Sequence, residues 1–142
     1  MKLIVLLLFP AFLSIQSSAY PGQGGAELLK SNTWITHFSL EPVVKDRRSI
    51  KVKFKQDGSS LNFAVTCHYS ELGLGSDATV ELESNIILHD NTFDVRSNLN
   101  QATTNDQGKP CSATLSAGTY PYVISWDNTQ VTMFHRAFAP KK

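Results

Sequence analysis

The chain has 142 residues, of which 42% are hydrophobic, 18% charged and 10% aromatic, and its 13 basic side chains nearly balance 12 acidic ones. This composition excludes a disordered, collagen-like or low-complexity chain, and it excludes a basic module that binds nucleic acid through net charge alone. A length of this order suits one folded domain.

The N-terminus has the pattern of a secretory signal peptide. Lys2 supplies the positive charge, residues 3–12 form an apolar run, and Ser17, Ser18 and Ala19 place small side chains at the cleavage site. The run is much shorter than the roughly 20 residues that a membrane-spanning helix needs. With no cysteine near the cleavage site for a lipid anchor, we expect a secreted or periplasmic protein. The expected parts are a signal peptide (1–19), a flexible lead with a helical turn (20–31), one β domain (32–138) and a short tail (139–142).

Cys67 and Cys111 are the only cysteines. An even pair in an oxidising compartment predicts a disulfide, which closes a loop of about 45 residues. The alternative, two buried free thiols, would leave both side chains open to oxidation during secretion. Neither a Cys-x-x-Cys motif nor a nearby Cys/His ligand set indicates a metal site.

Alternation of apolar and polar residues dominates the chain and predicts mostly β structure. The clearest hairpin begins at residues 50–55 and turns at Asp57-Gly58, a dipeptide favoured in two-residue type I′ turns. Closing the hairpin there pairs Phe54 with Leu61, and the other apolar residues fall on the same face. A slip of one residue would set lysines against apolar side chains, so the pattern specifies the register.

Two more hairpins are expected, with turns at residues 90–91 and 127–128. The second of these pairs Tyr122 with Met133 and places His135 on the inward face that Met133 occupies. Residues 71–77 and 98–110 are expected to be loops. Further strands are expected at Trp34–Leu40, Ala78–Leu82 and Ser112–Leu115.

Short antiparallel strands with one apolar face must close or stack to hide that face and their edges. We therefore expect an all-β fold, an antiparallel meander of about eight strands that closes into a small barrel. A two-sheet β-sandwich remains the alternative.

The chain resembles small secreted lipocalin-like barrels, which have a short helical turn, a tryptophan on the first strand (here Trp34) and a late Gly-x-Tyr strand (here Gly118-Thr119-Tyr120). It is also similar to META-type domains, in which a Trp-led strand precedes a Phe-x-x-Asp-Gly hairpin and a cysteine, matched here by residues 54–58 and Cys67. Both resemblances imply a barrel-like fold and a ligand-binding role.

Motifs for catalysis or metal binding are absent from the sequence. The four histidines show no His-x-His or His-Glu-x-x-His spacing, and no Gly-x-Ser-x-Gly motif or phosphate-binding glycine loop is present. Glu81 and Glu83 share a strand face, but a solvated outer face accounts for them. We therefore expect neither an enzyme nor a cofactor or metal.

We expect a non-enzymatic binding protein that takes a small apolar or amphipathic ligand in a barrel mouth, with core packing as the alternative role for its aromatic residues. The second hypothesis is an extracellular or envelope interaction module or inhibitor. It would act through loops 70–78 and 97–111 or through a basic strand. The lysines of that strand could also be simply the solvent-exposed face of an amphipathic strand. The candidate ligand residues are Trp34, Tyr120, Tyr122, Trp126 and His135, and the candidate basic patch is Arg47, Arg48, Lys51, Lys53 and Lys55.

Overall fold

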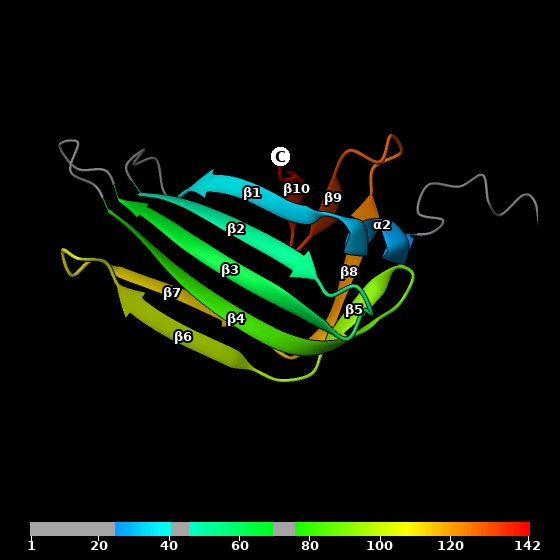
Figure 1. Cartoon of the computed structure of the whole chain (residues 1–142), viewed down its shortest axis with the longest axis horizontal. Coiled ribbons are helices and arrows are strands. Elements are labelled where there is room, and N and C mark those ends of the chain that lie inside the picture. The colour runs from blue at the N-terminus through cyan, green and yellow to red at the C-terminus, as the bar shows by residue number, and fades with distance from the viewer. Residues whose placement is uncertain (1–24, 41–45, 70–75) are drawn as a thin grey trace, which may run out of the picture.

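The computed structural model describes residues 25–40, 46–69 and 76–142 (Figure 1). The expected signal peptide, residues 20–24 of the lead and most of the loop at 71–77 lie outside the described residues. The described segments are α2 (Gly25–Ser31), β1 (Thr33–Ser39), β2 (Asp46–Phe54), β3 (Ser60–Tyr69), β4 (Asp77–Leu88), β5 (Thr92–Val95), β6 (Leu99–Thr104), β7 (Pro110–Leu115), β8 (Gly118–Ile124), β9 (Val131–Met133) and β10 (Arg136–Pro140).

Eight strands close into an antiparallel barrel in the order β1-β10-β9-β8-β5-β4-β3-β2, and β6 and β7 form a separate two-stranded sheet. The closed barrel confirms the first of the two expected architectures. Along β4, buried and exposed residues alternate, because every second side chain points into the barrel. The interior is filled by large side chains, among which Trp34, Phe54, Phe93 and Phe138 are fully buried.

The registers of the three expected hairpins are confirmed, including Phe54 opposite Leu61. The turn type expected at Asp57-Gly58 is wrong, because only Gly58 has a positive φ, of 76°, whereas a type I′ turn needs two such residues. The Asp57 carboxylate accepts hydrogen bonds from the Ser59 backbone N–H (2.9 Å) and hydroxyl (2.6 Å). These bonds lower the pKa of Asp57 and hold a four-residue loop.

The expectation that residues 98–110 form a loop is wrong. Residues 99–104 form β6, which pairs with β7 from Leu99 opposite Leu115 to Thr104 opposite Pro110. All but the first residue of β6 are exposed, so the strand carries no apolar alternation by which its sequence would reveal it. Strand β7 alternates and buries Cys111 and Ala113. The expected disulfide between Cys67 and Cys111 is present and ties β7 to β3.

The end of the chain differs from the expectation at His135. Strand β9 stops at Met133, and Phe134 (φ 55°) and His135 (φ 59°) form a two-residue turn that sets Arg136 opposite Met133. His135 is therefore exposed instead of facing inward with Met133. Strand β10 then pairs with β1 and closes the barrel, and it includes the first two residues of the expected tail.

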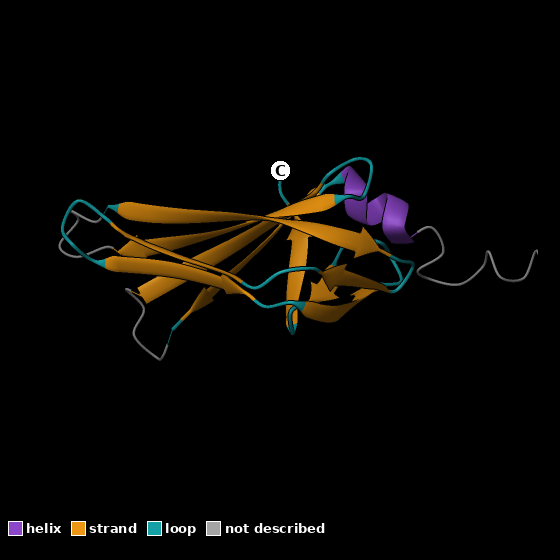
Figure 2. Cartoon of the chain, turned by 90° about the horizontal axis from the view of Figure 1, so that it is seen from below, coloured by secondary structure: helices purple, strands orange, loops and turns teal. Residues whose placement is uncertain are grey.

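The short helix α2 lies at one end of the barrel (Figure 2). Leu29 of α2 is fully buried, and the indole N–H of Trp34 donates a hydrogen bond to the Leu29 carbonyl oxygen at 3.0 Å. Gly25 lies so close to the Asp90 carbonyl and the Ile124 side chain that an added Cβ would meet both at 3.3 Å. Side chains at this end therefore leave α2 little room to move. None of the described helical residues belongs to a helix long and apolar enough to cross a membrane.

Candidate functional site

Two of the five candidate ligand residues belong to the core. Trp34 is 0% exposed and serves to anchor α2. Tyr122 is buried, and its hydroxyl donates a hydrogen bond to the His89 carbonyl oxygen at 2.6 Å. Burial, with a smaller contribution from the nearby charge of Asp90, raises the pKa of Tyr122 to about 12. Both side chains are thus held by contacts within the protein.

The other three candidates lie apart from one another. Tyr120 is half-buried, stacks on Phe93 with ring centroids 5.6 Å apart and donates a hydrogen bond to the Ser116 carbonyl oxygen. Trp126 is 82% exposed in the turn between β8 and β9, and His135 is exposed in the turn between β9 and β10. The structure therefore does not bring the five predicted residues together as one site.

The candidate basic patch is divided between the two faces of β2. Arg47, Lys51 and Lys53 alternate with the buried residues of the strand and point outward, and Lys55 is exposed beyond the end of β2. Arg48 has the opposite parity, which it shares with the buried Ile50 and Val52, so it lies on the inner face. In the sheet, Arg48 stands opposite Phe38 of β1 and Cys67 of β3.

Around Arg48, cationic and aromatic side chains alternate across four neighbouring strands. The Arg136 guanidinium carbon lies 3.6 Å from the centre of the Phe38 ring, and that of Arg48 lies 5.2 Å from the centre of the Tyr69 ring. We name the four residues Arg136, Phe38, Arg48 and Tyr69 the cation–aromatic row. All four are half-buried. Because Phe38 is near the end of β1, the row lies at the end of the sheet opposite α2 (Figure 1).

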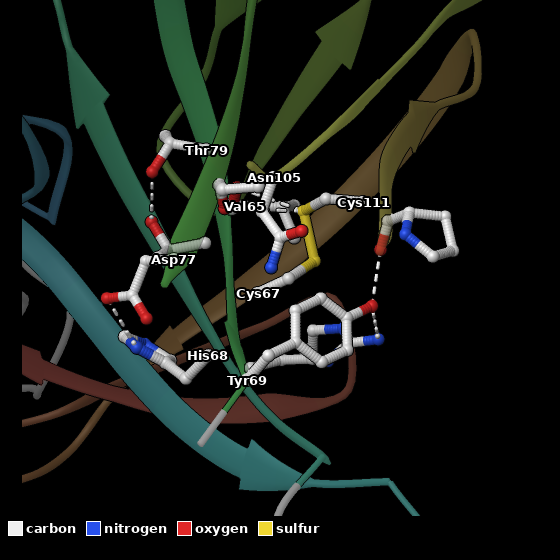
Figure 3. Close-up of a disulfide and its surroundings, with 12 residues drawn as sticks. Val65, Cys67, His68, Tyr69, Asp77, Thr79, Asn105 and Cys111 are labelled. Atoms are coloured by element: carbon white, nitrogen blue, oxygen red, sulfur yellow. Dashed lines mark hydrogen bonds and ion pairs between the residues drawn. A yellow bond between two sulfur atoms is a disulfide. The ribbon is translucent and has the colours of Figure 1, made fainter. Parts of the chain in front are cut away.

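Tyr69 is fixed in place by two hydrogen bonds beside the disulfide (Figure 3). Its hydroxyl donates to the Pro110 carbonyl oxygen and accepts from Nη2 of Arg48 at 3.3 Å. Pro110 precedes Cys111, so the disulfide to Cys67 sets the distance between the strands that carry the donor and the acceptor. The disulfide between β3 and β7 therefore helps to position Tyr69, at one end of the row.

The two arginines of the row have no acidic partner among the described residues, whose ion pairs are Lys30–Glu27, His68–Asp77 and His89–Asp94. A guanidinium group carries five N–H donors in a planar fork that matches a carboxylate or phosphate. Arg48 donates to the Arg47 carbonyl oxygen and to Tyr69, which leaves further donors for a ligand. The row therefore combines two aromatic faces with two cations that form no ion pair with any described residue.

A shallow pocket of about 220 Å³ lies at the same end of the sheet and is lined by His37, Phe38, Ser39, Arg47, Arg48 and His68. His68 is held by its partners, with Nδ1 3.1 Å from the Asp77 carboxylate and Nε2 3.2 Å from the Ser49 hydroxyl. Among the described residues no three histidine, cysteine or acidic side chains gather as a metal site. Basic and aromatic side chains therefore predominate at this end of the sheet.

Sequence reasoning singled out Arg48 but missed Phe38, Tyr69 and Arg136. The parity of Arg48 with Ile50 and Val52 was a signal that this one basic residue faces inward. No comparable signal was available for Arg136, because its position depends on the turn before it and on the pairing of β10 with β1. No family model, curated protein or solved structure matches this chain.

Proposed function

We propose that this protein is a secreted, non-enzymatic binding protein that holds an anionic amphipathic small molecule at the cation–aromatic row. The observation that carries the proposal is the position of two arginines, Arg48 and Arg136, on either side of Phe38, with no acidic partner among the described residues. Half-buried cations are costly to leave unpaired, and an anionic ligand would supply the missing charge.

The row suggests how such a ligand would bind. The carboxylate or phosphate would accept hydrogen bonds from the guanidinium groups, and the adjoining apolar part would lie against Phe38 and Tyr69. Fully buried side chains such as Trp34 and Phe138 occupy the interior. We therefore place the ligand at the end of the sheet, on top of the filled core.

The compartment is part of the proposal. A disulfide is typical of proteins in an oxidising environment, and Cys67–Cys111 fits the signal peptide expected at residues 1–19. An extracellular or periplasmic location would keep this bond, and with it the position of Tyr69, intact.

Calorimetric titration of the oxidised protein with dodecanoate and dodecyl phosphate, and with dodecanol as the neutral analogue, tests the proposal. We expect one of the anions to bind at least tenfold more tightly than dodecanol, because a hydrogen bond to a charged group contributes about 1.5–3 kcal/mol. Arg48→Gln and Arg136→Gln should each remove this difference. Lys55→Gln is the control, because Lys55 is exposed beyond the far end of β2 and does not line the pocket beside Arg48.

The outcomes separate the alternatives. Binding of dodecanol as tight as that of the anions would show that the arginines do not select the ligand. Equal weakening by Lys55→Gln would show that the anions respond to net charge and not to the two arginines of the row. Failure of both anions to bind would refute the proposed function.

A further inference from the structure

The outer face of the sheet carries an ordered pattern of charge that the proposed ligand site does not use. Two cross-strand rows run from β2 over β3 to β4, Lys51–Ala64–Glu81 and Lys53–Asn62–Glu83. Each row has a base on β2, a neutral residue on β3 and an acid on β4. Neighbouring strands are about 4.8 Å apart, so the bases and acids of one molecule are separated by roughly 10 Å. None of these four charged groups is in an ion pair within the described structure.

This pattern is self-complementary under one two-fold rotation. If a second copy is turned by 180° about an axis parallel to β3 and laid face to face, its β2 lies over β4 of the first copy, and its β4 over β2. Rotation about such an axis does not shift the rows along the strands. Lys51 of each copy therefore meets Glu81 of the other, and Lys53 meets Glu83. A two-fold axis that also lies between the two facing sheets but crosses the strands would instead place β2 over β2, and therefore lysine over lysine.

The shape of this face also favours a close approach. A hollow of about 360 Å³ lies between Lys51 and Lys53 on one side and Glu81 on the other, and Ala64 and Thr66 contribute to its floor. Ala64 is a small residue in the middle strand, and Thr66 is held by a 3.0 Å hydroxyl–hydroxyl hydrogen bond to Thr79. The longer charged side chains on either side of this hollow can reach those of a facing copy.

We propose that the outer face of β2, β3 and β4 binds the same face of a second copy of this chain, as a two-fold symmetric dimer held by Lys51–Glu81 and Lys53–Glu83 pairs between molecules. An isologous contact of this kind is the usual geometry of homodimers. The face is narrow and its pairs are polar, so the dimer is weak, concentration-dependent and sensitive to salt. The ligand site lies on the opposite face of the sheet and is independent of this contact.

Sedimentation equilibrium of the oxidised protein at increasing concentration, in 20 mM and in 500 mM salt, tests the dimer. We expect the average mass to rise from the monomer toward the dimer at low salt and to stay near the monomer at high salt. The variants Lys51→Glu/Lys53→Glu, with an all-acidic face, and Glu81→Lys/Glu83→Lys, with an all-basic face, should each raise the dissociation constant at least tenfold. Lys109→Glu is the control for a change of net charge, because Lys109 lies between β6 and β7, outside the three strands of this face.

Mixing gives the decisive measurement. The all-acidic and all-basic variants repel their own copies but complement each other, so an equimolar mixture should form a heterodimer. Recovery of association shows that both variants are folded and that the charged rows form the interface. A wild-type protein that stays monomeric at low salt, variants that dimerise like the wild type, or a mixture that does not associate would each overturn the proposal.

Discussion

Loss of the Cys67–Cys111 disulfide should destabilise the fold substantially. The bond joins residues 44 positions apart, and the chain-entropy model gives about 4 kcal/mol for closing a loop of this size. Near the melting temperature of a domain of this size, that loss lowers Tm by roughly 15 °C. Both sulfur atoms are buried, so replacing them also removes packing, and Cys67→Ala/Cys111→Ala should be less stable than the reduced wild type.

The measurement is denaturant unfolding of the oxidised wild type, the reduced wild type and the double alanine variant. Comparing the two wild-type forms isolates the cross-link, because the side-chain volume is unchanged. Fluorescence of the buried Trp34, after replacement of the exposed Trp126 by Phe, would report on the barrel near α2, away from the bond. If reduction lowers the free energy of unfolding by less than about 1 kcal/mol, the loop-entropy argument is wrong for this protein.

Three further changes test individual contacts. Trp34→Phe should cost about 2 kcal/mol in urea unfolding, because the Leu29 carbonyl loses its partner and a cavity is left at α2. His135→Gly should raise the free energy of unfolding by about 1 kcal/mol, and with it Tm, because glycine adopts a φ of 59° without a Cβ penalty. An unchanged Tm would argue against backbone strain at His135. Tyr122 has a raised pKa in the folded state, so its contribution to stability is complete below the unfolded value of 10 and is lost as the pH rises through about 12. Tyr122→Phe should remove that part of the alkaline pH dependence in equilibrium unfolding, and an identical profile would contradict it.

The hairpin registers were predictable because the sequence alternates most clearly there. In β2, lysines separate Ile50, Val52 and Phe54, and only one register keeps all three against the apolar residues of β3. The turn conformation at Asp57 was not predictable from the same dipeptide, because it depends on the hydrogen bonds that its carboxylate accepts from Ser59. In this chain the alternation of residues therefore predicts the strand register but not the turn type.

Strand β6 and the cation–aromatic row escaped prediction for different physical reasons. Strand β6 is held by its pairing with β7, and its side chains are too polar to show a buried face. The row depends on contacts between distant parts of the sequence, such as that of Arg136 with Phe38, which exist only once β10 has closed the barrel against β1. A single sequence contains the residues of such a site, but gives no sign of their proximity.

The position of Arg136 illustrates how strain at a turn is offset by packing in the core. Two consecutive residues of the turn, Phe134 and His135, hold a left-handed conformation that costs roughly 1–2 kcal/mol each in an L-residue. The Phe134 ring offsets this conformational cost through contacts with Phe63 and Tyr120, at centroid distances of 5.3 Å and 5.0 Å, and with two other aromatic rings. Such pairs contribute about 0.5–1.5 kcal/mol each. Because Arg136 follows directly, the aromatic cluster that stabilises the turn also sets the guanidinium over Phe38, and the core thereby determines the geometry of the proposed anion site.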